Sequence, residues 1–151
     1  MIRLSAFADE IAGDLEEQLD ALAEDGIAHL DLRAVWGTPV LQLTDEQIER
    51  TRRLLDARGI RVAAIGSPIG KTPIDAPFHE EIDRFERAVS LARELGARYI
   101  RVFSFYPPAA VAGSFDWADY RDEVIGRLRE LTARARAADL ILTHENEKEI
   151  Y

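Results

Sequence analysis

The residues with the clearest capacity for chemistry stand near the end of the sequence, where an apolar stretch runs into several carboxylates. Leu140–Glu145 alternates like a short β-strand, so successive side chains point to opposite faces. Glu145 then stands at the carboxyl end of a strand, where α/β proteins place catalytic groups. Glu147 shares its face if the strand continues, whereas His144 points the other way and is expected to pack toward helices. Glu145 is therefore the first candidate catalytic residue.

Charged side chains recur on one face of the other predicted strands as well. The apolar face should meet the helices and carries Leu30, Leu32, Ile100, Val102, Leu140 and Leu142. The opposite face carries Asp31, Arg33, Arg101, Thr143 and Glu145. Parallel strands that are covered on both faces are normally apolar throughout, and burying unpaired charges is costly. The pattern predicts a polar, water-accessible cavity enclosed by the strands; the alternative is a set of structural ion pairs such as Asp31 with Arg101.

Further candidates for substrate binding lie where other strands are expected to end. Ser67 and Lys71 follow the third predicted strand and could hold a substrate oxygen or a phosphate. Arg33 and Arg101 could bind an anionic substrate, and Glu147 could line the same cavity as Glu145. Four aromatic residues could form an apolar wall for a sugar ring or simply pack in the loops: Trp36, Phe103, Phe105 and Tyr106. The other histidines, His29 and His79, are interpreted as structural or exposed.

Five strands and four helices alternate along the sequence and place these candidates at the strand ends. The strands are predicted at Ile2–Phe7, His29–Arg33, Ile60–Ser67, Arg98–Phe103 and Leu140–Glu145. The helices begin near Asp14, Thr44, Pro77 and Asp116 and have apolar residues at helical spacing. Short loops precede the strands and longer loops follow them, as expected when function lies at the strand carboxyl ends. No linker interrupts this pattern, so residues 1–151 are predicted to form a single domain or a piece of one.

The overall composition narrows the classes of function. The chain has no cysteine, which excludes disulfides and thiolate metal sites. Its formal net charge of -9 argues against binding to a nucleic-acid backbone. No apolar run approaches the ~20 residues of a membrane span, and the N-terminus lacks the pattern of a signal peptide. A cytoplasmic location with no membrane partner is therefore expected.

Three phrases at successive predicted strand ends resemble a known family. They are Gly66-Ser-Pro-Ile-Gly-Lys71, Tyr99-Ile-Arg-Val-Phe-Ser104 and His144-Glu-Asn-Glu-Lys148. Their order and placement resemble the sugar phosphate isomerases and epimerases of the xylose isomerase-like barrel superfamily. The resemblance covers essentially the whole chain. It implies an α/β fold, namely a partial (β/α)8 TIM barrel of about five parallel strands and four helices.

The resemblance also implies a reaction. Members hold a divalent ion, often Mn²⁺ or Mg²⁺, with carboxylates and a histidine from the last four strands, and Glu145 matches the first of these ligands. In epimerases of this kind the same glutamate is one of two acid/base carboxylates. The ion polarises a ketose carbonyl, the glutamate removes the neighbouring proton, and an enediolate forms. The expected partner is a small carbohydrate, which is a sugar, a sugar phosphate or a related polyol ketone.

The chain departs from the family pattern after its fifth predicted strand. Strands six to eight would supply the other three metal ligands and the second glutamate. A domain truncated at Tyr151 is therefore expected to bind the ion weakly or not at all, and to be inactive alone. Its first and fifth strands would be open edges, which predicts a homo-oligomer.

Other classes of function fit parts of the pattern. A lyase resembling inosose dehydratase would use the same face of the barrel. An apurinic endonuclease shares the barrel but needs a basic groove, which this acidic chain does not encode. A five-stranded doubly wound domain of the flavodoxin type would bind a nucleotide or a protein partner without catalysis. Strand order separates the barrel, with consecutive neighbours, from the doubly wound sheet, whose order reverses.

Overall fold

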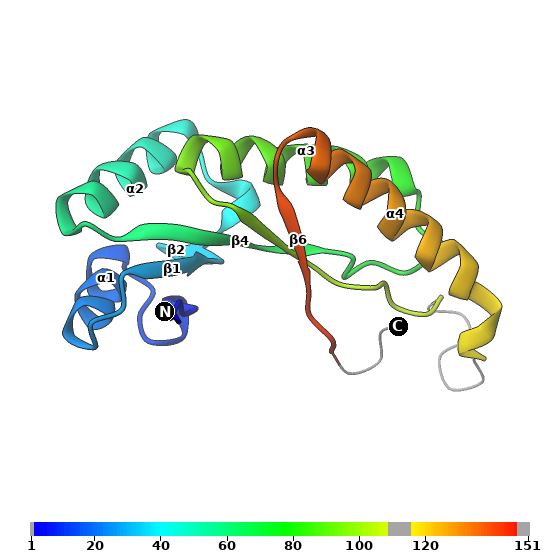
Figure 1. The fold of residues 1–151 in the computed structure, drawn as a ribbon, viewed down its shortest axis with the longest axis horizontal. Coiled ribbons are helices and arrows are strands. Elements are labelled where there is room, and N and C mark those ends of the chain that lie inside the picture. Colours follow the sequence, from blue (N-terminus) through cyan, green and yellow to red (C-terminus); the bar gives the residue numbers. More distant parts are fainter. Residues whose placement is uncertain (1, 109–115, 148–151) are drawn as a thin grey trace.

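The computed structural model describes residues 2–108 and 116–147 and shows a parallel sheet with helices packed against it (Figure 1). The sheet contains β1 (His29–Leu32), β4 (Arg61–Ile69), β5 (Tyr99–Val102) and β6 (Ile141–His144), in the order β1-β4-β5-β6. The helices are α1 (Leu15–Glu24), α2 (Asp45–Arg58), α3 (Phe78–Leu95) and α4 (Arg121–Ala137). Consecutive strands are neighbours throughout, as in a partial TIM barrel, and no reversal of a doubly wound sheet occurs in the described residues.

Short elements complete the chain between these strands and helices. Strands β2 (Ala34–Val35) and β3 (Thr38–Pro39) form a small antiparallel hairpin in what the sequence predicts as a loop. The described residues also form the 3₁₀ turns η1 (Ala8–Glu10), η2 (Val40–Gln42) and η4 (Trp117–Tyr120). The helix predicted from Asp116 therefore begins as a 3₁₀ turn and becomes α-helical at Arg121. Ser114, in the loop before this helix, lies outside the described residues. So does Lys148, the last residue of the phrase that begins at His144.

The helix starts follow from capping residues in the sequence. The Asp14 side chain accepts hydrogen bonds from the backbone amides of Glu16 and Glu17, so it satisfies two of the free amides at the start of α1. Thr44 and Gln47 form the reciprocal capping box of α2, in which each side chain bonds the other residue's amide. Such caps stabilise a helix by roughly 1 kcal/mol.

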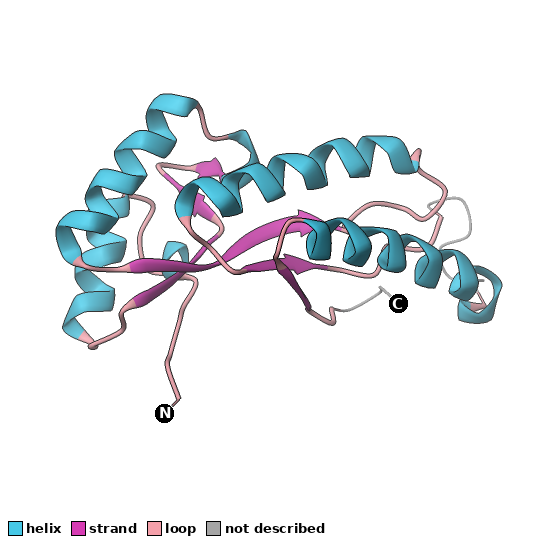
Figure 2. Ribbon diagram, turned by 45° about the horizontal axis from the view of Figure 1, so that its top comes forward, coloured by secondary structure: helices cyan, strands magenta, loops and turns pink. Residues whose placement is uncertain are grey.

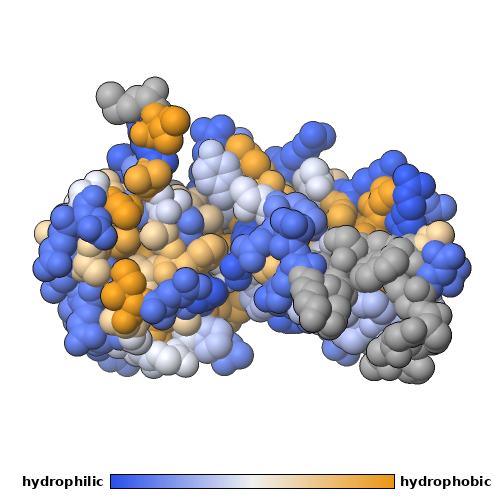
Figure 3. All heavy atoms as spheres, turned by 90° about the horizontal axis from the view of Figure 1, so that it is seen from below, coloured by the Kyte–Doolittle hydropathy of each residue, from blue (hydrophilic) through white to orange (hydrophobic). Residues whose placement is uncertain are grey.

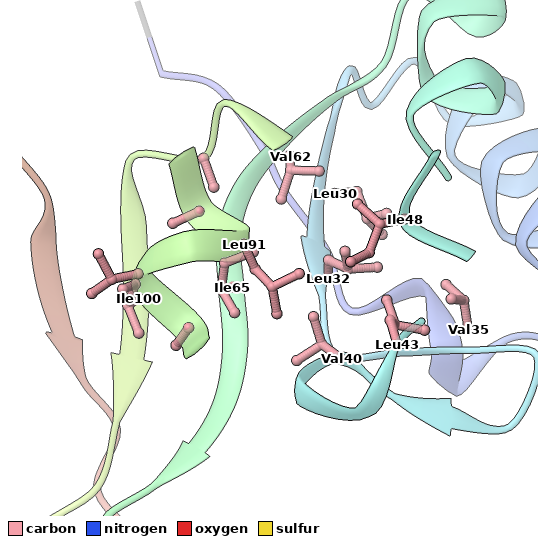
Figure 4. Close-up of a cluster of buried hydrophobic side chains, with 14 of the residues drawn as sticks. Leu30, Leu32, Val35, Val40, Leu43, Ile48, Val62, Ile65, Leu91 and Ile100 are labelled. Carbon is pink, nitrogen blue, oxygen red and sulfur yellow. The ribbon is translucent and has the colours of Figure 1, made fainter. Parts of the chain in front are cut away.

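The core lies between the sheet and the helices, on the face that the alternation predicts. Leu30, Leu32 and Ile100 are fully buried there, with Ile65 from the central strand and Leu91 from α3 (Figure 4). Helix α3 packs on β4 and β5, and α4 packs on β6 (Figure 2). Burial of each such side chain contributes about 1.5–3 kcal/mol to the stability of the fold. This layer therefore fixes the strands whose opposite face carries the charged side chains. No helix of the described residues is long and apolar enough to cross a membrane.

The first predicted strand does not form, which corrects the expected count of five strands to four. Only Ala6 bridges to the sheet, in parallel with Leu30, and Ile2 and Leu4 are 91% and 67% exposed. The register explains the difference. Four residues before Ala6, Ile2 would lie opposite Gly26, which stands in the turn after α1 and offers no strand to pair with.

Candidate functional site

The sheet face opposite the core borders an open cavity of about 770 Å³ (Figure 3 views this face). Its lining includes Asp31, Arg101, Thr143 and Glu145, which are four of the five residues on the predicted polar face. A cavity thus lies on the predicted face, and apolar residues such as Leu4 and Val62 line it beside the charged ones. Arg33, the fifth residue, is not among the lining residues.

A bulge in β4 shapes the carboxyl end of this cavity. Ile65 pairs with Ile100 and Ile69 pairs with Val102, so β4 advances four residues while β5 advances two. Residues 66–68 therefore bulge out of the ladder. The strand continues to Ile69, beyond the end that the sequence predicts at Ser67. Gly66 is required here, because a Cβ atom would lie 2.9 Å from Cε1 of Phe7 and 3.0 Å from Cβ of Arg33.

Arg101 fills the space that the bulge opens. Its Nη2 donates to the carbonyl oxygen of Gly66 at 3.1 Å, and its Nε and Nη2 donate to that of Ser67 at 3.4 Å. The guanidinium carbon lies 4.8 Å from the ring centre of Phe7 and 4.9 Å from that of Phe103. The Ser67 hydroxyl in turn donates to the carbonyl of Arg101 at 2.6 Å. The structure therefore brings the predicted binding residues Ser67 and Arg101 together, and both are buried.

Glu145 stands at the end of β6 and faces the cavity. Its amide donates to the carbonyl of Val102 at 3.0 Å, so the backbone still follows the sheet at this residue. Oε2 accepts from Nη1 of Arg101 at 3.3 Å, and the side chain stays 43% exposed. A carboxylate that is fixed on one oxygen and open to the cavity on the other is suited to accept a proton from a bound molecule.

Asp31 lies on the same face, and its pairing with Arg101 is the alternative that the sequence leaves open. No such ion pair forms among the described residues, because the guanidinium is turned toward Glu145 and the β4 carbonyls. Asp31 instead accepts a hydrogen bond from the Ser5 hydroxyl at 2.9 Å. Burial raises the pKa of the Asp31 carboxyl, and the Ser5 hydrogen bond and the positive charge of Arg101 oppose the rise only in part.

Two predicted binding residues are engaged in contacts just after β1, beyond its carboxyl end. Arg33 bonds Asp9 at 2.8 Å and Glu10 at 3.2 Å, and the Asp9 carboxylate raises the pKa of this guanidinium. The Trp36 indole donates to Asp14 at 3.1 Å and lies under the Arg50 guanidinium, 4.3 Å from its carbon. Neither Arg33 nor Trp36 lines the cavity.

Lys71 and Glu147 form an ion pair between two strand ends. Nζ of Lys71 lies 2.5 Å from Oε2 of Glu147 and 4.4 Å from the ring centre of Phe103. Neither residue is among those lining the cavity, so the pair stands beside it, where the chain segments after β4, β5 and β6 meet. The structure thus brings together two residues predicted to bind the substrate and leaves them neutralising each other.

Gly70 fixes the turn that carries Lys71. It has a φ of 85°, and a Cβ atom would lie 2.1 Å from the carbonyl oxygen of Phe103, so only glycine fits. Its amide donates to the carboxylate of Glu81 on α3, which also pairs with Arg84 at 2.8 Å. Sequence pattern gave no sign of this role for Glu81, because a glutamate in the first turn of a helix is ordinarily exposed.

The histidines and loop aromatics differ in part from their predicted places. His144 is exposed and lines the cavity instead of packing toward helices, because β6 is an edge strand whose end has no covering helix in the described residues. His29 also lines the cavity. Phe105 is fully buried beside Ile74 and Phe78 and so belongs to the core rather than to a wall for a sugar ring.

The described residues do not by themselves fit a divalent ion. Mn²⁺ and Mg²⁺ prefer several oxygen or imidazole ligands. Residues 2–108 and 116–147 bring no three His, Asp or Glu side chains together in a suitable cluster. Glu145 offers one carboxylate, and its neighbour is a guanidinium.

Comparisons with known proteins show what the sequence and the fold of this chain are similar to. Residues 19–150 match the family model described as xylose isomerase-like TIM barrel. A protein of that description from Mycobacterium smegmatis, solved in complex with magnesium, is 24% identical and superposes with a TM-score of 0.67, covering 95% of this chain. The structure of L-ribulose 3-epimerase gives 16% identity, a TM-score of 0.70 and 99% coverage. No protein in the curated set matches the chain.

A dehydratase shares the same fold. The "probable 3-DHS dehydratase AsbF" from Bacillus anthracis is 17% identical, with a TM-score of 0.74 and 99% of this chain covered. The chain spans about half the length of these three structures, which is 49%, 51% and 54%. At these identities the likeness shows a common fold.

Proposed function

The chain belongs to the xylose isomerase-like TIM barrel family, and from this premise we propose that it supplies part of the active site of an isomerase or epimerase. The substrate class is a small sugar, a sugar phosphate or a related polyol ketone. Glu145 is the proposed acid/base residue, and Ser67, Lys71, Arg33, Trp36 and Glu147 are proposed to bind or shape the site. A cytoplasmic location and self-association are part of the same proposal.

The position of Glu145 is the observation that carries this proposal. Its carboxylate ends β6, opens onto the cavity and is held on one side by Arg101. In the proposed reaction, Glu145 takes the proton from a carbon next to a ketone carbonyl and an enediolate forms. Return of the proton to the neighbouring carbon on the same face, with transfer of the hydroxyl proton from one enediolate oxygen to the other, completes an isomerisation with one carboxylate. Epimerisation requires a second proton carrier, because the proton must return to the opposite face.

A divalent ion would supply charge stabilisation for the enediolate when bound. Of the residues described, Glu145 is the proposed ligand, and it does not make a site for Mn²⁺ or Mg²⁺ alone. The steps assigned to this chain are therefore limited to what its own residues do. They hold the proton at the Glu145 carboxylate and admit the substrate to the cavity.

Substitution of Glu145 by glutamine tests the proposal. Gln keeps the size and one oxygen atom but cannot accept the proton, so turnover should fall by ~10²-fold or more, the scale of general acid–base catalysis. The fold should survive, because the side chain is 43% exposed and outside the apolar core. The measurement is steady-state kinetics on the active enzyme with ketose substrates. Thr143→Val, earlier on the same strand face, is the matched control and should be much milder. Full activity in Glu145→Gln would refute the assignment.

A lyase is the second candidate, and the fold shared with a dehydratase favours considering it. The first step would be the same removal of a proton next to a carbonyl. Loss of the hydroxyl group on the following carbon would then give an unsaturated ketone. Ultraviolet absorbance of the product separates the two reactions, since an isomer of the substrate carries no conjugated double bond.

A further inference from the structure

We propose that Arg101 is a positioning residue, which sets the orientation of the Glu145 carboxylate, and that it does not bind a substrate anion. This inference rests on the proposed role of Glu145 as acid/base residue. It changes the role that sequence pattern gives to Arg101, as a candidate for binding an anionic substrate.

The hydrogen-bonding capacity of the guanidinium is the first argument. An arginine side chain has five N–H donors, on Nε, Nη1 and Nη2. Nε and Nη2 are directed at the carbonyls of Gly66 and Ser67, and Nη1 is directed at Glu145. The rings of Phe7 and Phe103 lie over the guanidinium within 5 Å of its carbon. A substrate anion would therefore compete with Glu145 for Nη1, the nitrogen that is not directed at a backbone carbonyl.

Burial is the second argument. The Arg101 side chain is only 10% exposed, whereas the Glu145 side chain is 43% exposed. Both side chains line the cavity, and the carboxylate is by far the more accessible of the two. A charge buried in this way must be paired and hydrogen-bonded, and the two backbone carbonyls and Glu145 meet that need.

The bulge of β4 is the third argument. Extra residues in a strand leave carbonyls without ladder partners. The Arg101 guanidinium donates hydrogen bonds to these carbonyls at residues 66 and 67. The same residue accepts the Ser67 hydroxyl bond through its own carbonyl oxygen. Arg101 thus joins β4, β5 and β6 at their carboxyl ends, and the orientation of Glu145 follows from this joint. A lysine could not replace it, because an ammonium group lacks the planar fork that reaches two directions at once.

Kinetics of Arg101 variants test the inference. Arg101→Met and Arg101→Lys should each lower kcat at least tenfold while KM changes by less than threefold, because the substrate is bound but the carboxylate is misplaced. Arg53→Met is the matched control. Arg53 is exposed on α2 and does not line the cavity, so kcat should stay within twofold. A rise in KM for a phosphorylated or carboxylated substrate with kcat retained would overturn the inference and restore the anion-binding role.

A stability measurement on this chain tests the coupling that the inference requires, without activity. In a double-mutant cycle, the melting temperatures of Arg101→Lys, Glu145→Gln and the double variant should show non-additive shifts, since the two side chains contact each other. The same cycle with Arg53→Met in place of Arg101→Lys should be additive. Additive shifts for Arg101 and Glu145 would overturn the inference. Failure of the proposed function appears separately, as an unaffected turnover in Glu145→Gln.

Discussion

On the polar face of the sheet, the free-energy cost of a charged side chain depends on the partners around it. Asp31 and Glu145 point into the same cavity, yet only Glu145 pairs with Arg101. Asp31 relies on a neutral hydroxyl, that of Ser5, and its burial raises its pKa. A carboxyl group that is buried without a direct cation disfavours its ionised form, so the native protein holds its proton more tightly than the unfolded chain does.

This difference predicts how stability depends on pH. The folded pKa of Asp31 lies above the unfolded value, so its contribution is most favourable below the unfolded pKa and is lost as pH rises through the folded pKa. Asp31→Asn removes the titration while keeping an acceptor for Ser5. We expect the variant to be more stable than the parent at neutral pH. The gain should shrink as the pH is lowered through the raised folded pKa and level off below the ordinary aspartate value of about 3.9.

Urea unfolding of both proteins over a series of pH values measures this gain. Ser5→Ala is the companion variant. It removes the hydrogen bond that favours the ionised form, so the pH dependence should become steeper instead of vanishing. A gain in Asp31→Asn that stays constant across the series would contradict the assignment.

At the scale of elements, the turn after β4 is the most constrained point of the site. Gly70 approaches the backbone of Phe103 so closely that no side chain fits, and its amide is bonded by the buried carboxylate of Glu81. The amides of Phe103 and Phe105 donate to Ile69 and Gly70 at 2.7 and 2.8 Å. The segments after β4 and β5 are therefore held as one unit that carries Lys71.

Replacing Gly70 by alanine should destabilise the protein by roughly 2–4 kcal/mol, because it combines a steric clash with an unfavourable positive φ. Gly126→Ala is the control within the same chain. Gly126 lies inside α4, is exposed and has no atom within 4 Å of the added Cβ, so this change should stabilise by about 0.5–1 kcal/mol. Thermal unfolding monitored by circular dichroism measures both, and equal effects of the two changes would contradict the close contact at Gly70.

The helices and the polarity of the strand faces could be predicted from the sequence, because their causes are local. Thr44 and Gln47 mark the start of α2 by their spacing, and the alternation of Leu30 and Leu32 marks the apolar face. The bulge in β4 could not be predicted, since it is defined by pairing with a strand more than thirty residues away.

The partners of the site residues depend on that long-range pairing as well. The sequence suggests Asp31 as a partner for Arg101, whereas the guanidinium, directed by the bulge, pairs with Glu145. The failure of the first strand has the same origin, because only the register of Ala6 with Leu30 shows that the residues before it have nothing to pair with.

For the whole molecule, the sheet ends in two open edges. The edge strands β1 and β6 lack a further strand among the described residues. Ile2 and Leu4, which precede the bridge of Ala6 to β1, and Ile141 in β6 are exposed. Unpaired parallel edges with apolar side chains favour association. We expect two copies to associate through them, which sedimentation velocity at tens of micromolar protein should show as a dimer. Leu4→Lys with Ile141→Lys should shift the species toward monomer, whereas Ile11→Lys, at an exposed position outside both edges, should not. A stable monomer in the parent would contradict this.

Metal binding by the chain is the second prediction at this scale. Calorimetric titration with Mn²⁺ should show weak or no binding, because the described residues bring one candidate carboxylate ligand to the strand ends and place a guanidinium beside it. Glu145→Gln is the companion variant and should leave the weak signal unchanged or smaller. Saturable binding at micromolar ion would contradict the prediction and would make His144 and Glu147 the next ligands to test.

The placement of Trp36 has an optical consequence. Its indole is held between Asp14 at the start of α1 and Arg50 of α2, in a corner that does not line the cavity. In a Trp117→Phe background, the tryptophan fluorescence would come from Trp36 alone. Its emission would then report the separation of α1, the β2–β3 hairpin and α2 during unfolding, and it would stay silent when a small molecule enters the cavity.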